Sequence, residues 1–212
     1  ITHSPAVSYP ALNLGGIANL SFLPRSGDVL GFDSGPGNCL LDLWAFRHLG
    51  TQHDAGGAWA AAGRVTPALL ERMLQEPYFA APPPKSTGRD RFNAAWLQKM
   101  LKGGEDAQAV QATLLELTAQ SVATAVSRHC HGARRLIICG GGAKNGALMR
   151  RLAELAAPAS VESSERHGIA PQLVEAAAFA WLAKRALDGR PGNLPPVTGA
   201  RGPRVLGALY PR

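Results

Sequence analysis

The chain has 212 residues, of which 46% are hydrophobic and 17% charged, so it has enough apolar sequence to bury a core. No apolar stretch reaches the roughly 18 residues that a membrane-spanning helix requires, and the first ten residues lack the basic and apolar regions of a signal peptide. The formal charge of +7 comes from scattered basic residues without an aromatic-rich basic motif, so it indicates a small anionic ligand or an acidic protein surface rather than nucleic acid.

The first part of the chain predicts three short strands, one helix and then an insertion. Apolar residues alternate between turns rich in Gly and Pro, and then recur at helical spacing up to Gly50. The strands are expected at residues 11–14, 18–23 and 29–32, and the helix at residues 40–49. Residues 51–104 are rich in Gly and Pro and are interpreted as an insertion of loops and helices. Its two helical patterns cover residues 67–74 and 92–101.

The second half of the chain predicts helices that alternate with strands. The helices are expected at residues 106–129, 147–155 and 171–187, and the strands at residues 134–139 and 159–162. The last helix is rich in Ala, so its small side chains suit close packing, and the tail after it is expected to be irregular. In chain order the elements predict an α/β fold, a mixed sheet with helices on both faces. This order resembles one lobe of the actin-like ATPase (ribonuclease H-like) architecture, in which paired lobes hold a ligand between them.

Three glycine-rich turns adjoin the predicted strands, in the strings LGGIANLS, GFDSGPGN and CGGGAKN. Glycine lets the backbone approach a ligand closely, and amides at the start of a helix favour phosphate. Each turn alone also fits a tight structural turn, and none has the spacing of a Walker loop or a dinucleotide fingerprint. Three such turns at strand ends favour a ligand crevice, because crevices of α/β sheets form at these positions.

Two acids adjoin the predicted crevice, and each has a structural and a chemical interpretation. Asp33 either caps the following helix or bonds within its turn, or it acts as a general base beside phosphate-binding amides. Ser34 and Asn38 are suited to the capping role, which leaves the acid for chemistry. Glu175 lies one turn into the Ala-rich helix, where it either complements the helix dipole or contacts a polar ligand.

The segment PPKSTGRDRFN, residues 83–93, gathers Lys85, Arg89 and Arg91 around small polar residues. It contacts an anion, closes a lid, or forms a charged surface loop. The sequence does not choose among these, so the roles of Lys85 and Arg89 stay open.

The three cysteines are too few and too irregularly spaced for a disulfide framework, which indicates a reducing cytoplasm. The string RHCH at residues 128–131 lacks metal-ligand spacing and a second cluster, so no metal site is expected there. Cys139 is interpreted as a small buried hydrophobic residue.

Seven parts of the sequence closely resemble the anhydro-N-acetylmuramic acid kinases and occur in the same order. They are LNLGGIANLSFL, GFDSGPGN, PKSTGRDRFN, QATLLELTA, CGGGAKN, HGI with EAAAFAWLA, and PGNLPPVTGA. Because several of these strings are unusual, chance similarity is a poor explanation. The resemblance covers essentially the whole chain and implies the C-terminal part of such an enzyme, in the superfamily of sugar kinases, Hsp70 and actin.

The resemblance implies an ATP-dependent reaction with Mg²⁺ as the cofactor. Enzymes of that family open the 1,6-anhydro ring of anhydro-N-acetylmuramic acid and phosphorylate O6, giving N-acetylmuramic acid 6-phosphate and ADP in cell-wall recycling. By resemblance, Asp33 is the general base that activates water, and Glu175 contacts the sugar. The residues expected to bind the nucleotide are Gly15, Gly16, Asn19, Gly35, Gly140, Gly141, Gly142 and Asn145.

The N-terminal lobe of that family, with its G-T-S-x-D-G phosphate-binding loop, is not in this sequence. We therefore expect residues 1–212 to be a C-terminal lobe with little kinase activity alone. The resemblance favours a homodimer as well. The first alternative is a non-catalytic, nucleotide-dependent binding lobe, which would need neither Asp33 nor Glu175. The second is a kinase of another sugar, which the string GFDSGPGN disfavours.

Overall fold

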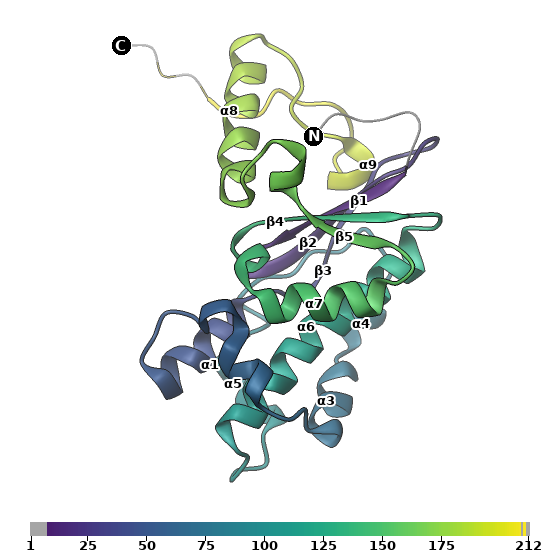
Figure 1. Ribbon diagram of the computed structural model, residues 1–212. Helices are drawn as coiled ribbons and strands as arrows, with labels where there is room; N and C mark the ends of the chain where they lie inside the picture. Colours follow the sequence, from purple (N-terminus) through teal and green to yellow (C-terminus); the bar gives the residue numbers. More distant parts are fainter. Residues whose placement is uncertain (1–7, 209, 211–212) are drawn as a thin grey trace.

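The computed structural model describes residues 8–208 and Tyr210; residues 1–7, on which the expectation about a signal peptide falls, lie outside this part. Within the described residues, a five-stranded sheet has the strand order β3-β2-β1-β4-β5 (Figure 1). The strands are β1 (Tyr9–Leu14), β2 (Ile17–Leu23), β3 (Leu30–Pro36), β4 (Arg135–Cys139) and β5 (Ser160–Ser163). The first three pair antiparallel, whereas β4 pairs parallel with both β1 and β5. The predicted mixed sheet is therefore confirmed.

Helices cover both faces of this sheet, as predicted. On one side α6 packs against β3 and α7 against β5, whereas α9 contacts β3 from the side on which α8 also lies (Figure 1). The helices are α1 (Cys39–Leu49), α2 (Ala58–Ala62), α3 (Pro67–Leu74), α4 (Pro77–Ala80), α5 (Ala94–Met100), α6 (Ala107–His129), α7 (Gly146–Ala156), α8 (Val174–Leu187) and α9 (Pro195–Thr198). The sequence does not predict α2, α4 and α9, because helices of four or five residues are too short to show a periodic pattern.

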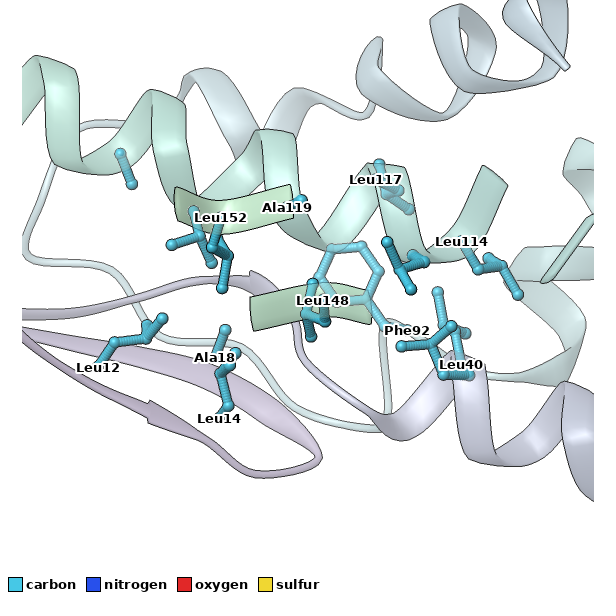
Figure 2. Packing of buried hydrophobic residues seen from close by; sticks show 14 of the residues in the cluster. Leu12, Leu14, Ala18, Leu40, Phe92, Leu114, Leu117, Ala119, Leu148 and Leu152 are labelled. Atoms are coloured by element: carbon cyan, nitrogen blue, oxygen red, sulfur yellow. The ribbon is translucent and has the colours of Figure 1, made fainter. Parts of the chain in front are cut away.

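The core lies between the sheet and the pair α6–α7. Leu12 and Leu14 of β1 point toward Leu148 and Leu152 of α7, and all four are fully buried (Figure 2). Because side chains alternate along a strand, Asn13 between these leucines faces the opposite side of the sheet. The alternation along β1 thus places the polar side chain of Asn13 on the face of the sheet away from the core.

One prediction about an individual element is wrong. Strand β3 continues past Phe32, because Asp33 pairs with Asn19 and Gly35 pairs with Ala18. The residue between them, Ser34, is the extra residue of a β-bulge, so GFDSGPGN is mostly a strand rather than a turn.

The predicted Ala-rich helix is present as a 3-10 turn at Pro171–Leu173 followed by α8, and none of the residues of α8 is buried within the described part of the chain. Its large side chains Phe179 and Trp181 are 65% and 53% exposed. No described helix combines the length and the hydropathy that crossing a bilayer requires. The three cysteines are free thiols, and burial raises the pKa of Cys139, as expected for a buried hydrophobic residue.

Candidate active site

The carboxylate of Asp33 is buried and accepts three hydrogen bonds. The side-chain amide of Asn19 donates to Oδ1 at 2.8 Å, and the Ser86 hydroxyl and the Thr87 amide both donate to Oδ2 at 2.9 Å. An ionised carboxylate offers about four acceptor positions. Within the described residues, the position that stays open is therefore on Oδ1.

The backbone around Asp33 is held as firmly as its side chain. Its amide donates to the carbonyl of Lys85 at 3.1 Å, and the Tyr78 hydroxyl donates to its carbonyl at 2.8 Å. The segment that begins at Lys85 thus runs along the edge strand β3 and brings Ser86 and Thr87 to the carboxylate. Asp33 is only 8% exposed, so this site holds a fixed and mostly dehydrated carboxylate.

The capping interpretation of Asp33 is wrong, because its carboxylate has the three other partners. The alternative caps are wrong as well: Ser34 donates its hydroxyl to the carbonyl of Ala18, and Asn38 donates its side-chain amide to the carbonyl of Leu14. No side chain caps α1.

Instead, the carbonyls of Gly15 and Gly16 accept hydrogen bonds from the amides around the start of α1. Gly37 and Cys39 donate to Gly16, and Asn38 donates to Gly15, at 2.8–3.0 Å. A side chain at Gly37 would collide with the Gly15 carbonyl, so glycine permits this approach of two backbones. Hydrogen bonds between their backbones therefore fix the turn at residues 15–16 against residues 37–39.

The turn Gly140–Gly142 packs differently from residue to residue. A Cβ atom at Gly142 would lie 2.6 Å from the Cβ atom of Leu14, and one at Gly140, where φ is +83°, would lie 2.8 Å from the Leu14 carbonyl oxygen. At Gly141 the nearest atom to such a Cβ is the amide nitrogen of Asn38, 4.0 Å away. Of these three glycines, only Gly141 has open space where a side chain would be.

That space belongs to a cavity of about 520 Å³ between this turn, α1 and the loop before α2. Its lining includes Gly141, Gly142, Asn145, Asp42, Lys144 and Gln172. Burial raises the pKa of Asp42, while the charges of His53 and Arg89 act in the opposite direction. Asp54 also lines the cavity, but its carboxylate accepts the amides that begin α2. The lining combines hydrogen-bonding side chains, carboxylates, one lysine and exposed glycine backbone.

The sequence profile of one protein family, described as "Anhydro-N-acetylmuramic acid kinase", matches residues 1–212. The chain belongs to this family. A protein of that name from Xanthomonas campestris pv. campestris (strain 8004) is 57% identical over 94% of this chain and 53% of its own length. One from Burkholderia orbicola (strain MC0-3) is 53% identical over 99% of this chain and 56% of its own length. The chain thus spans about half the length of these relatives.

A solved structure supports the predicted actin-like lobe at the level of the fold. The activator of the 2-hydroxyisocaproyl-CoA dehydratase from Clostridium difficile, solved with bound ADPNP, matches with a TM-score of 0.50 and 15% sequence identity. The match covers 80% of this chain and 57% of that one.

In this member of the anhydro-N-acetylmuramic acid kinase family, the residues predicted to bind nucleotide fall into separate places. Gly141, Gly142 and Asn145 line the large cavity, where Asn145 also caps α7. Asn19 contacts Asp33 instead. Gly35 packs against the ring of Phe79 and does not line the large cavity.

Glu175 lies in the first turn of α8, as expected, and is exposed. Its charge raises the pKa of the Cys139 thiol, although burial contributes more, so it lies near the carboxyl end of β4. It makes no hydrogen bond to another described residue. Its side chain is therefore available to a ligand.

Sequence reasoning missed several residues of this family member's site. Ser86 and Thr87 were noticed only as neighbours of basic residues, and Lys144 only as part of its glycine string. Asp42 carried a usable signal, because it lies one helical turn after Asn38 and therefore shares its face of α1. No group of three or more His, Cys, Asp or Glu side chains within residues 8–208 and Tyr210 is arranged to hold a metal.

Proposed function

We propose that this chain is the C-terminal lobe of an enzyme that uses ATP to convert 1,6-anhydro-N-acetylmuramic acid into N-acetylmuramic acid 6-phosphate and ADP. The observation that carries the proposal is the fixed carboxylate of Asp33, with one acceptor position open on Oδ1, in a chain of this kinase family. Such a reaction would serve peptidoglycan recycling.

In this proposal Asp33 is the general base. A water molecule bound at the open position of Oδ1 gives its proton to that oxygen while its own oxygen attacks the anomeric carbon. The bond from that carbon to O6 of the sugar breaks, and O6 attacks the γ-phosphorus of ATP. The bond between that phosphorus and the β–γ bridging oxygen breaks, and ADP leaves. Asn19, Ser86 and Thr87 keep the carboxylate oriented throughout.

Thr87 supplies a further sign that a ligand belongs beside Asp33. Its hydroxyl is buried and has no hydrogen-bond partner within the described residues. Buried hydroxyls normally have a partner. A bound water or a sugar hydroxyl would satisfy it, and Glu175 would contact the sugar from α8.

The large cavity fits a nucleoside. Its volume of about 520 Å³ lies within the range of ligand sites, and the open space at Gly141 admits a flat base against the backbone. Asp42 would accept from ribose hydroxyls, and Lys144 would bind phosphate oxygens. Mg²⁺, held mainly through the phosphates of ATP as is usual for this ion, would neutralise their charge. Gly15 and Gly16 would act indirectly, by holding the start of α1.

We also propose that a second lobe, corresponding to the other half of the relatives, completes the enzyme. The exposed apolar side chains Phe179 and Trp181 on α8 are surfaces that such a lobe would cover. The chain alone would then have little activity. The complete enzyme would work as a homodimer in the cytoplasm, a compartment that suits its free thiols.

The test compares this chain alone with a joined enzyme, in which it follows the N-terminal half of the Xanthomonas campestris relative. We expect the joined enzyme to release ADP with anhydro-N-acetylmuramic acid and not with glucose or glycerol. We expect the chain alone to release little. Nucleotide binding without turnover in the joined enzyme would favour the binding-lobe alternative and contradict the proposal.

A further inference from the structure

A second cavity, of about 230 Å³, lies beside the segment that holds Asp33, and Asp33 is not among its lining residues. It is lined by the C-terminal half of α6, by α4 and by Lys85, with Ser34 of β3 at its edge. Consecutive residues thus serve different sites: Ser86 bonds to the carboxylate of Asp33, whereas the side chain of its neighbour Lys85 lines this cavity. This cavity shares no lining residue with the large cavity.

The charged groups in the lining of this cavity are all basic. Lys85, Arg128 and His129 line it, and its lining contains no carboxylate. Three polar side chains complete the wall. The Ser121 hydroxyl donates to the carbonyl of Thr118 and the Gln120 amide to the carboxylate of Glu116, so the Thr124 hydroxyl is the one of the three that donates to no described residue. Neither Lys85 nor Arg128 forms an ion pair with any described residue. A concave surface with this composition carries positive charge that the chain does not neutralise.

The positions of Lys85 and His129 are fixed by aromatic and backbone contacts, whereas Arg128 is exposed. The ammonium of Lys85 donates to the carbonyl of Tyr78 at 2.9 Å and lies 4.6 Å from the centre of its ring. The ring of His129 packs edge-on against Phe32, with 5.2 Å between ring centres. The ammonium also donates to the carbonyl of Phe79 at 3.4 Å, so Lys85 has a defined position and one ammonium proton left to donate.

The electrostatic effects of these groups on one another agree with an unneutralised cluster. Burial lowers the pKa of Lys85, and the charge of Arg128 lowers it further. The pKa of His129 is lowered by burial and then by Lys85, Arg128 and His131. The positive charges of these groups therefore repel one another, and a bound anion would offset this repulsion.

We propose that this cavity binds a phosphate group, either free inorganic phosphate or the phosphate of a sugar monoester. Arg128 and Lys85 supply the charge, and Thr124 supplies a hydroxyl donor. The volume suits this class of ligand, because about 230 Å³ holds a tetrahedral oxyanion together with several waters of about 30 Å³ each. Guanidinium groups match the geometry of phosphate oxygens, so Arg128 is the main contact.

The test is calorimetric titration of the 212-residue chain with inorganic phosphate and, separately, with glucose 6-phosphate, at an ionic strength held constant with sodium chloride. We expect saturable binding of both, weakened about tenfold or more in Arg128→Gln and further in Arg128→Glu. Equal affinities would identify free phosphate as sufficient. Tighter binding of glucose 6-phosphate would identify a sugar phosphate as the ligand.

Two matched variants locate the binding. Arg25→Gln removes an exposed arginine in the β2–β3 turn, and it should leave both affinities unchanged. Lys144→Gln removes the lysine of the large cavity, and it should also leave them unchanged. Binding that persists in Arg128→Glu, that disappears in Lys144→Gln, or that does not exceed the chloride background would overturn the proposal.

Discussion

The hydroxyl of Ser86 donates to the carboxylate of Asp33 at 2.9 Å, across 53 positions of sequence. This contact joins a segment rich in basic residues to the edge strand of the sheet. Because the Thr87 amide donates to the same oxygen, the segment fixes the direction of the carboxylate as well as its position.

Ser86→Ala should therefore lower the turnover of the joined enzyme while leaving its KM for ATP unchanged. The carboxylate would keep two of its three donors, so we expect kcat to fall about tenfold, equivalent to one lost hydrogen bond to a charged group. Ser86→Thr, which keeps the hydroxyl, should restore most of the activity. Steady-state kinetics measures both. Ser26→Ala in the exposed β2–β3 turn is the control, and an unchanged kcat in Ser86→Ala would rule out the positioning role.

The two neighbouring glycines of the cavity turn should respond in opposite ways. Gly142→Ala places a Cβ atom against Leu14, so we expect a loss of about 1–3 kcal/mol in the free energy of unfolding of the chain. Gly141→Ala meets no such neighbour and should change stability by less than about 0.5 kcal/mol.

The added methyl group of Gly141→Ala would instead enter the cavity and should raise the KM for ATP of the joined enzyme about tenfold. Denaturant unfolding and steady-state kinetics separate the two effects. If Gly141→Ala leaves the KM for ATP unchanged, the nucleotide does not occupy this cavity.

The buried carboxylate of Glu116 on α6 forms a two-point ion pair with Arg151 on α7, at 2.7 and 2.8 Å. The bonds from Arg151 lower the pKa of Glu116 below its ordinary value. A lowered folded-state pKa adds stability above the unfolded pKa of glutamate, and this stability is lost as the pH falls through the folded value.

Arg151→Met should therefore cost about 2 kcal/mol at neutral pH, and the cost should shrink as the pH falls through and below the usual range of glutamate. Denaturant unfolding of the chain over a pH series measures this difference. Arg150→Met, at the exposed neighbouring position, is the control and should have little effect. A cost for Arg151→Met that stays constant with pH would contradict this assignment.

The sequence predicted those helices and strands whose bounds depend on residues within or next to them. The helix α3 begins and ends where its pattern indicated, because Pro67 fixes its start and apolar residues recur at helical spacing. The strand β3 did not follow its local pattern, because glycines at Gly35 and Gly37 were interpreted as a turn. Pairing with β2 and the bulge at Ser34 extend the strand instead, and pairing partners far along the chain are not visible in a short window.

The same distinction separates the predicted and the missed parts of the site. Asp33 was conspicuous because an acid is unusual in a glycine-rich string. Its donors from Ser86 and Thr87 were not predictable, since no spacing links positions so far apart. Gly15 and Gly16 were interpreted through their amides, yet the structure uses their carbonyls to hold the start of α1. A glycine-rich string indicates that another group lies close to the backbone. It does not indicate whether that group is a ligand or another segment of the chain.

The most direct test of the central proposal is the turnover of the joined enzyme carrying Asp33→Asn. Loss of the base should lower kcat by about a hundredfold or more, while the affinity for a non-hydrolysable ATP analogue stays within a factor of about two. Asp28→Asn, in the β2–β3 turn, should behave as the unmodified enzyme. Near-normal release of ADP and N-acetylmuramic acid 6-phosphate by Asp33→Asn would contradict the role of Asp33 as the general base.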